Sequence, residues 1–224
     1  MSGGEALARS LVNEGIEVVF GVPGIQVYGI VAALRDEPGI RMIATRHEQA
    51  TTFMADGYAR VSGSPGVALV VPGAGLYNAA SGLTNAYARS SPVLLIAGQI
   101  PRQAIGKDIG AVHEVLDQPG TVRSITKWQR RVLRPREVPD AVFEAFRQMR
   151  TGRPRPVLIE IPPETGVGAG GGPVAEPRPD SPDRARPRRP SRSRSGHHRV
   201  ADAADIRRWG CSTLQRREQS DRVG

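Results

Sequence analysis

The chain has 224 residues and a formal net charge of +9, and 39% of its side chains are hydrophobic. A chain of this length can form one domain with a full core, alone or followed by a tail, and its single cysteine, Cys211, excludes an internal disulfide framework and a metal site built from several cysteines. No apolar run reaches the roughly 18 residues that cross a bilayer, and no basic segment with an apolar core marks a signal peptide, so we expect a soluble cytoplasmic protein.

Helical and strand patterns alternate along the first 165 residues. Apolar side chains recur at helical spacing in several segments, and short continuous apolar runs typical of strands separate these segments. Helices are expected at about 3–15, 27–34, 46–62, 75–89 and 137–151, with a short helix near 112–116 in an otherwise irregular 99–120 segment. Strands are expected at 17–20, 40–44, 67–71, 92–98, 122–128 (an edge strand) and 156–161. The alternation predicts an α/β fold, a doubly wound, six-stranded, mostly parallel sheet with helices on both faces.

The composition changes abruptly near residue 165. Residues 1–165 carry 18 basic and 15 acidic side chains, whereas residues 166–224 carry 13 and 7 and hold only six Leu, Ile, Val or Phe among 59. So few apolar side chains cannot offset the entropic cost of ordering. We therefore predict a folded domain over 1–165 and a disordered, low-complexity Arg/Pro/Ser tail over 166–224. The tail could also be an out-of-frame or truncated reading of a longer gene.

Ligands of a doubly wound sheet bind outside the carboxyl ends of its strands. Four features are expected there: the turn 21–24, Glu48 at the start of the 46–62 helix, the turn 73–75, and Gln99. Each has a structural alternative, since a carboxylate suits the first turn of any helix and glycines let a strand and a helix approach closely. These residues by themselves indicate only a site near Glu48.

The helix expected over 46–62 has an apolar stripe that should face the core. This stripe consists of Ala50, Phe53, Met54, Gly57, Tyr58 and Val61. His47 is expected to pack or to form a hydrogen bond, and His113 beside Glu114 is either a solvated loop pair or an acid/base pair.

Several motifs together closely resemble those of the thiamine diphosphate enzymes of the acetolactate synthase group. The core of the resemblance is Arg46-His47-Glu48-Gln49-Ala50, followed by Met54-Ala55-Asp56-Gly57-Tyr58-Ala59-Arg60. Further matching segments follow the family order, at 20–24, 70–78, 98–102, 124–127, 151–154 and 156–159. The resemblance covers about residues 3–164 and implies the N-terminal, pyrimidine-binding domain of that family.

The resemblance implies a catalytic role for Glu48. The family's matching glutamate hydrogen-bonds a ring nitrogen of the cofactor's aminopyrimidine and favours the imino tautomer, whose nitrogen takes the proton from the thiazolium C2 carbon. The other residues that match cofactor-binding positions are Val22, Pro23, Gly24, Gly73, Gly75, Asn78 and Gln99. Arg153 matches an arginine that contacts flavin in synthases that carry FAD, so FAD binding is also possible.

The resemblance implies a transferase or lyase that acts on a 2-keto acid, and acetolactate formation is the leading expectation. Val112 and His113 stand roughly where synthases carry the Phe and Gln that shape the substrate site, and Ala74 replaces a proline of the family turn. Because of these departures, a decarboxylase or another carboligase stays open as an alternative.

The family binds the diphosphate and Mg²⁺ through a later domain with a Gly-Asp-Gly motif and a downstream Asn-Asn pair, which this sequence lacks. The family's active site also forms between two subunits. We therefore expect a truncated, incomplete enzyme that holds half a site and no metal ligands, as a homo-oligomer or paired with a chain that supplies the diphosphate domain. One alternative is a non-catalytic partner of a full-length relative. Another is nucleic-acid binding through the basic tail, which is disfavoured because Trp209 is the tail's only aromatic residue.

Overall fold

The computed structural model describes residues 1–168, so most of the tail predicted to be disordered lies outside the described residues. The described part contains a six-stranded sheet with the strand order β2-β1-β3-β4-β6-β5. Every strand pairing in it is parallel. The predicted doubly wound α/β sheet is confirmed, and it is wholly rather than mostly parallel.

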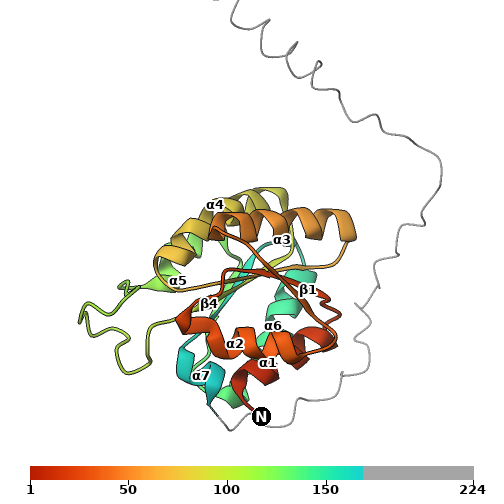
Figure 1. Cartoon of the computed structure of the whole chain (residues 1–224). Helices are drawn as coiled ribbons and strands as arrows, with labels where there is room; N and C mark the ends of the chain where they lie inside the picture. Colours follow the sequence, from red (N-terminus) through yellow and green to blue (C-terminus); the bar gives the residue numbers. More distant parts are fainter. Residues whose placement is uncertain (169–224) are drawn as a thin grey trace, which may run out of the picture. The chain divides into compact units, whose positions relative to one another are not determined.

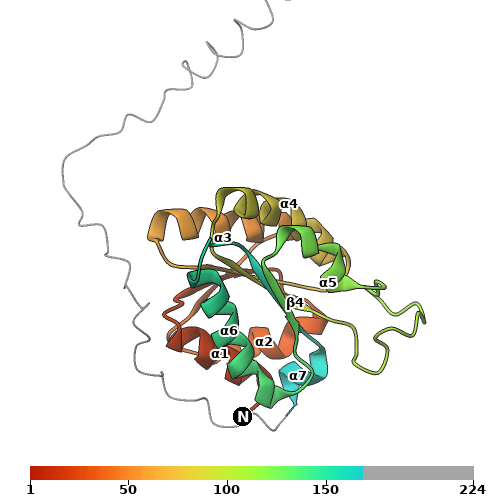
Figure 2. The same cartoon turned by 180° about the vertical axis from the view of Figure 1, so that it is seen from behind.

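Helices cover both faces of this sheet. Figures 1 and 2 show α3 and α4 on one face and α1, α2 and α6 on the other. The strands are β1 (Val18–Gly21), β2 (Arg41–Ala44), β3 (Gly66–Val70), β4 (Val93–Gly98), β5 (Trp128–Arg131) and β6 (Val157–Ile161). The helices are α1 (Gly3–Asn13), α2 (Tyr28–Asp36), α3 (Glu48–Ser62), α4 (Ala74–Arg89), α5 (Gln118–Thr121), α6 (Val138–Arg150) and α7 (Pro163–Val167), with 3-10 turns at Ile25–Val27, Arg123–Ile125 and Pro135–Glu137. Helix α7 runs across the predicted domain boundary at residue 165.

The central strands carry side chains of two separate cores. On β3, Val67 and Leu69 pack with α1, α2 and α6, whereas Ala68 and Val70 pack with α3 and α4. Strands β3, β4 and β6 are buried at every position. Burial on both faces explains why these strands read as continuous apolar runs rather than as alternating patterns.

Two predicted elements between β4 and β6 were wrong. Most of the strand expected at 122–128 is instead a 3-10 turn at Arg123–Ile125 and the residues that flank it, and the edge strand β5 begins only at Trp128. Residues 112–116 form turns, and the first helix after β4 is α5. The polar, half-buried strand β5 has no apolar run, whereas the apolar Val122 is buried in the core beneath α4.

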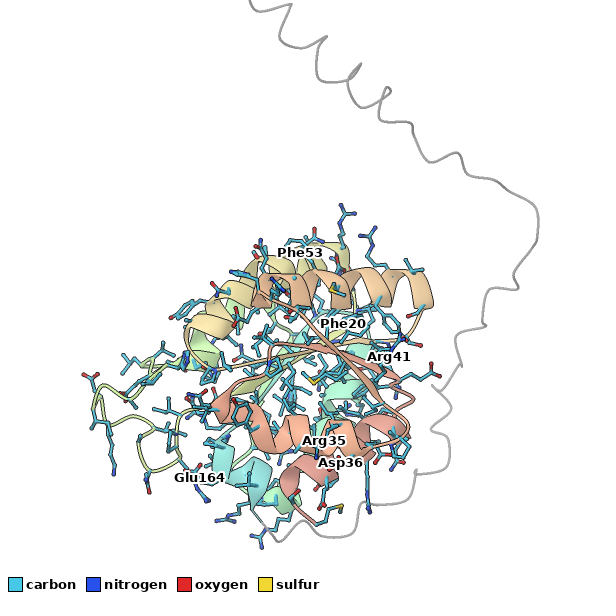
Figure 3. All side chains as sticks on the ribbon, in the orientation of Figure 1. Phe20, Arg35, Asp36, Arg41, Phe53 and Glu164 are labelled. Atoms are coloured by element: carbon cyan, nitrogen blue, oxygen red, sulfur yellow. The ribbon has the colours of Figure 1, made fainter. Side chains whose placement is uncertain are left out.

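The predicted core face of α3 was wrong for three of its large side chains, whereas Tyr58 packs against the core beside Phe20, as expected. Phe53, Met54 and Val61 are exposed to 41%, 39% and 83%. Figure 3 shows Phe53 on the outer side of α3, whereas Phe20 lies between α3 and the sheet. The buried face of α3 consists of the small or polar residues Thr51, Thr52, Ala55, Asp56 and Ala59.

Small residues let α3 and α4 pack closely. The hydroxyl of Thr52 donates a hydrogen bond to the carbonyl of Ala79 at 2.8 Å. A Cβ atom at Gly82 would lie 2.3 Å from the Thr52 Oγ1 atom and 2.8 Å from the Phe53 backbone nitrogen. This contact fixes α4 beside α3 and so positions the side chains at the start of both helices.

We expect Gly82→Ala to lower the free energy of unfolding by about 2 kcal/mol, because the added methyl group must push α3 away from α4. Gly57→Ala on the same helix pair is the control: its Cβ would meet nothing within 4 Å, so the substitution should stabilise the chain by about 0.5–1 kcal/mol. Urea denaturation measures both values. Equal midpoints for the two variants would contradict the close packing of the helices.

Candidate cofactor site

Glu48 lies at the carboxyl edge of the sheet, in the first turn of α3, after β2. His47 is the N-cap of this helix, and its Nδ1 atom accepts a hydrogen bond from the Gln49 backbone at 3.2 Å. The backbone of His47 is extended, as is usual for an N-cap, and its side chain satisfies one of the free amides of the first turn. The role expected for His47, a hydrogen-bonding residue, is confirmed.

The carboxylate of Glu48 is held on one side only. The Asn78 amide of α4 donates a hydrogen bond to the Oε2 atom of Glu48 at 3.0 Å, joining residues 30 positions apart. The Glu48 side chain is half-buried, and its Oε1 atom has no hydrogen bond among residues 1–168. The arrangement leaves one oriented carboxylate oxygen available to a ligand.

Two glycines bring the backbone of the following turn close to this carboxylate. A Cβ atom at Gly75 would lie 2.6 Å from the Val71 side chain and 3.4 Å from Glu48 Oε1. Gly73 is the N-cap of α4 and has a φ angle of 54°, a backbone conformation that glycine adopts more readily than residues with a side chain. The two glycines therefore let the backbone of the turn approach neighbouring residues closely, which is the structural role noted above as an alternative. The turn that they form also adjoins Glu48.

The turn after β1 and the end of β4 complete this edge. The Val22 amide donates to the Leu69 carbonyl at 3.2 Å, and Gly24 lies against the Val71 side chain, where a Cβ atom would be 2.3 Å away. Pro23 is exposed. Gln99 follows β4, is buried, and accepts a hydrogen bond from the Ile100 amide at 2.6 Å. All of these residues lie at the predicted edge of the sheet.

The segment with Val112 and His113 folds back onto the glycine turn. A Cβ atom at Gly73 would lie 2.4 Å from the His113 carbonyl oxygen, whereas the Val112 side chain is 75% exposed. Glu114 accepts hydrogen bonds from the Ile109 and Ala111 amides, at 3.1 and 2.8 Å. Its carboxylate therefore organises the loop backbone, which favours a structural role over an acid/base pair with His113.

Arg153 is not part of this site. Its Nε atom donates to the Ser90 hydroxyl at 2.7 Å, and Ser90 is the C-cap of α4. Because α4 begins at the carboxyl edge with Ala74, its C-terminal end lies toward the opposite edge of the sheet. A flavin contact at Arg153 would thus be separated from Glu48 by the length of α4.

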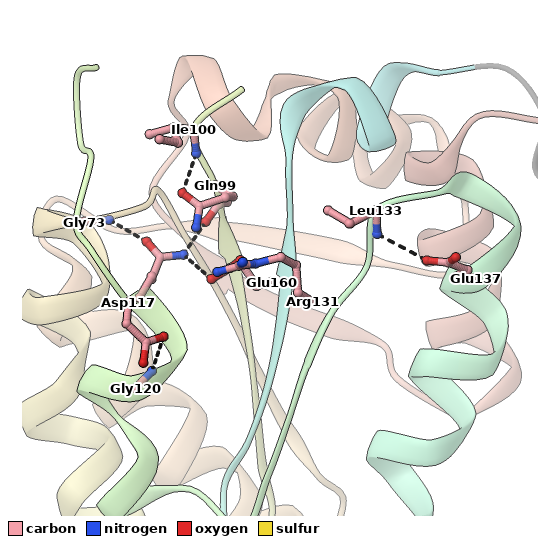
Figure 4. Close-up of polar contacts among 11 residues, drawn as sticks. Gly73, Gln99, Ile100, Asp117, Gly120, Arg131, Leu133, Glu137 and Glu160 are labelled. Carbon is pink, nitrogen blue, oxygen red and sulfur yellow. Dashed lines mark hydrogen bonds and ion pairs between the residues drawn. The ribbon is translucent and has the colours of Figure 1, made fainter. Parts of the chain in front are cut away.

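Three residues of a buried polar network were missed by sequence reasoning: Gln118, Glu160 and Arg131. Gln118 and Glu160 are fully buried, and Arg131 on β5 forms an ion pair with Glu160 on β6. Figure 4 shows this pair, with the side chain that is hydrogen-bonded to both Glu160 and Gly73. The one available signal was the charged residue within the apolar strand Val157-Leu158-Ile159-Glu160-Ile161, because a buried charge needs a partner.

The described part of the chain has neither a metal-binding cluster nor a membrane-spanning helix. Within residues 1–168, no group of three or more His, Cys, Asp or Glu side chains could hold a metal ion. No helix in this part has the length and apolar character needed to span a membrane.

The fold and the edge residues define an α/β domain that presents a carboxylate and glycine turns where parallel sheets bind ligands. The family model "Thiamine pyrophosphate enzyme, N-terminal TPP binding domain" matches residues 1–121, more than half of the chain. The chain belongs to this family of thiamine pyrophosphate enzymes.

Proteins similar to this chain include one named as a decarboxylase and several named as acetolactate synthase large subunits. The chain is 42% identical over 162 residues to a probable 2-ketoarginine decarboxylase, AruI, of Pseudomonas aeruginosa, a match that covers 72% of the chain and 29% of that protein. It is 43% identical over 162 residues to the acetolactate synthase large subunit of Buchnera aphidicola, a match that covers 72% of the chain and 28% of that protein. The chain is 40% identical to a probable acetolactate synthase large subunit of Methanocaldococcus jannaschii, a match that covers 72% of the chain and 27% of that protein. The matched region is thus less than a third of the length of each of these relatives.

Proposed function

We propose that this chain supplies the pyrimidine-binding half of a thiamine diphosphate site in a 2-keto-acid carboligase or decarboxylase. In this proposal Glu48 is the group that exchanges a proton with the aminopyrimidine ring. The observation that carries the proposal is the half-satisfied carboxylate of Glu48: Asn78 holds Oε2 at 3.0 Å, and no described residue bonds Oε1.

The donor set fits an aminopyrimidine. A carboxylate oxygen that is oriented and partly exposed can accept a hydrogen bond from a protonated ring nitrogen and can take up that proton. Glutamine could accept a similar hydrogen bond but could not exchange the proton. The Asn78 amide fixes the carboxylate without competing for its free oxygen, and Gly75 leaves space beside that oxygen.

Thiamine diphosphate, when bound, supplies the nucleophilic carbon and the electron sink for chemistry at the carbonyl of a 2-keto acid. This chain's contribution is orientation and proton transfer. Glu48 holds or releases a proton at Oε1, Asn78 keeps the carboxylate in place, and the turn at Gly73 and Gly75 brings backbone close to the ligand space. The diphosphate and its Mg²⁺ would be held by a domain beyond these residues, as the resemblance implies.

The substrate class rests on the names of the relatives and on the loop beside Gly73. Proteins named as a 2-ketoarginine decarboxylase and as acetolactate synthases match this chain about equally well. The loop residues Val112 and His113 differ from the synthase pattern, so we propose a 2-keto acid as the substrate without choosing between decarboxylation and carboligation.

An exposed apolar surface on α3 and α4 supports pairing with a second subunit. Phe53 and Met54 of α3 and Tyr77 of α4 are exposed to 41%, 39% and 51%, and they lie within one or two helical turns of Glu48 and Asn78. Contiguous exposed apolar side chains are typical of interfaces. We propose that a subunit carrying the diphosphate-binding domain covers this surface and completes the site.

Ligand-observed NMR tests the proposal on the chain itself. In saturation-transfer spectra of thiamine, we expect the pyrimidine methyl and ring protons to receive more saturation than the thiazolium protons, because Glu48 contacts the pyrimidine. Glu48→Gln should reduce the pyrimidine signal severalfold. Glu17→Gln, an exposed carboxylate before β1, should leave it unchanged. Equal signals from both rings, or an unchanged signal in Glu48→Gln, would contradict the proposal.

A further inference from the structure

Gln118, the first residue of α5, is fully buried, and its side-chain amide uses both ends in hydrogen bonds. Its Oε1 atom accepts from the Gly73 amide at 2.7 Å. Its Nε2 atom donates to the Gly98 carbonyl at 2.8 Å and to Glu160 Oε2 at 3.0 Å. One side chain thus joins the end of the 99–117 loop to residues at the ends of β3, β4 and β6. We refer to Gln118 with Gly73, Gly98 and Glu160 as the Gln118 network.

The partners allow only one orientation of the Gln118 amide. The Gly98 carbonyl and the Glu160 carboxylate are acceptors and need the nitrogen, whereas the Gly73 amide is a donor and needs the oxygen. The ion pair with Arg131 holds Glu160 in place from the neighbouring strand (Figure 4). An apolar side chain of the same size would remove a hydrogen bond from each of the three partners, and a glutamate would place a second carboxylate beside Glu160.

Gly73 has a second contact with the same loop. The His113 carbonyl packs over its α-carbon, where a Cβ atom would lie 2.4 Å from that oxygen. The backbone of His113 itself has a positive φ of 69°. The loop and the residue that follows it therefore contact Gly73 at two points: Gln118 accepts a hydrogen bond from its amide, and the His113 carbonyl packs against its α-carbon.

Gly73 is also the N-cap of α4, the helix that carries Asn78. A shift of Gly73 would move the first turns of α4 and with them the Asn78 amide that holds Glu48. The chain of contacts runs from Glu160 through Gln118 and Gly73 to Asn78 and Glu48.

We propose that Gln118 is a positioning residue, which holds the 99–117 loop on the glycine turn and thereby fixes the Glu48 carboxylate. The catalytic meaning of this positioning rests on the proposed function of Glu48. The network itself does not, because it consists of contacts within the chain.

Amide hydrogen exchange of Gly73, measured by NMR on the full-length chain, tests the proposal. In the wild type the Gly73 amide should exchange at least tenfold more slowly than in an unstructured peptide. Gln118→Met keeps the volume and removes the hydrogen bonds, so exchange at Gly73 should accelerate about tenfold or more. Gln129→Met is the matched control: Gln129 donates to the Pro119 carbonyl and to Thr126 and has no contact with Gly73, so exchange there should stay within about threefold of the wild type.

Exchanging the side chains of Gln118 and Glu160 tests whether Gln118 acts through its hydrogen bonds to Gly73 and Glu160 or only by stabilising the fold. Gln118→Glu alone should accelerate exchange at Gly73 as much as Gln118→Met does. In the double variant Gln118→Glu with Glu160→Gln, the new glutamine can donate to the new carboxylate, which can still accept from Gly73, whereas the Gly98 carbonyl loses its donor and Arg131 loses its carboxylate partner. We expect exchange at Gly73 to be slower in the double variant than in Gln118→Glu alone, because the two substituted side chains are coupled.

An unprotected Gly73 amide in the wild type would overturn the proposal, as would no recovery in the folded double variant. If Gln118→Met does not fold, the exchange rates of Gly73 in the wild type and in the double variant still test the proposal. These outcomes do not depend on what the site binds, whereas an unchanged thiamine contact in Glu48→Gln refutes the proposed function and leaves the Gln118 network intact.

Discussion

Turnover of a 2-keto acid is expected to fall by a factor of about 10²–10⁴ when Glu48 is replaced by Gln in the protein loaded with thiamine diphosphate and Mg²⁺. This is the range typical of losing a positioned acid/base group. The side-chain carbonyl of the introduced glutamine could still accept the 3.0 Å hydrogen bond that Asn78 donates to Glu48, so the fold and the geometry should persist while proton exchange is lost. Steady-state kinetics in the presence of the diphosphate-binding domain measures the effect.

The control for this substitution is Glu17→Gln, which removes an exposed carboxylate elsewhere and should leave turnover unchanged. Circular dichroism and the unfolding midpoint should be the same for all three proteins. Turnover of Glu48→Gln within about threefold of the wild type would show that the carboxylate does not handle a proton in the reaction.

A charged residue at Phe53 should prevent association with the second subunit. Phe53 is 41% exposed on the outer side of α3 (Figure 3), so Phe53→Asp should change the free energy of unfolding by only about 0.5 kcal/mol. If the α3 surface is covered in the assembled protein, the same substitution buries an unpaired charge in the interface. We expect the dissociation constant to rise at least about 100-fold, the effect of disrupting an interface hot spot.

Sedimentation velocity across a concentration series measures this change. Leu116→Asp is the matched control, because Leu116 is 90% exposed and lies in the loop before α5 rather than on α3. It should leave association as in the wild type. Equal weakening by the two substitutions, or by neither, would contradict an interface on α3.

The same surface shows a limit of sequence patterns. Phe53, Met54 and Val61 have the spacing of a core face, and a helix that is covered by another subunit has the same spacing as one that is covered by its own sheet. The pattern alone therefore does not distinguish a core face from a face that we propose to pair with a second subunit. The real core face of α3 contains Thr51 and Thr52, and this face is hard to recognise because threonine is mostly exposed in folded proteins.

The sheet and the position of Glu48 could be predicted, because local patterns determine both. The apolar runs of β3 and β4 and the helix signal after β2 are visible within short windows, and parallel connectivity then brings their carboxyl ends to one edge. The role proposed for Glu48 came from the family resemblance, since a carboxylate in a first helical turn is common.

The Gln118 network could not be predicted, because its contacts join distant residues. Gln118 and Gly73 are 45 positions apart, and Gln118 and Glu160 are 42 positions apart. No local period signals such a pair. The misplaced strand β5 has a related cause: its partner β6 lies more than 25 residues further along the chain, and the polar strand is stabilised by that pairing, including the ion pair of Arg131 with Glu160.

The most direct test of the role proposed for Glu48 is the rate of hydrogen–deuterium exchange at the thiazolium C2 position of bound thiamine diphosphate, measured by acid quench and proton NMR in the presence of the diphosphate-binding domain. We expect the wild type to accelerate this exchange over the free cofactor and Glu48→Gln to lower the rate at least about 100-fold. Equal exchange rates in the two proteins, with the cofactor bound in both, would contradict the central role assigned to Glu48.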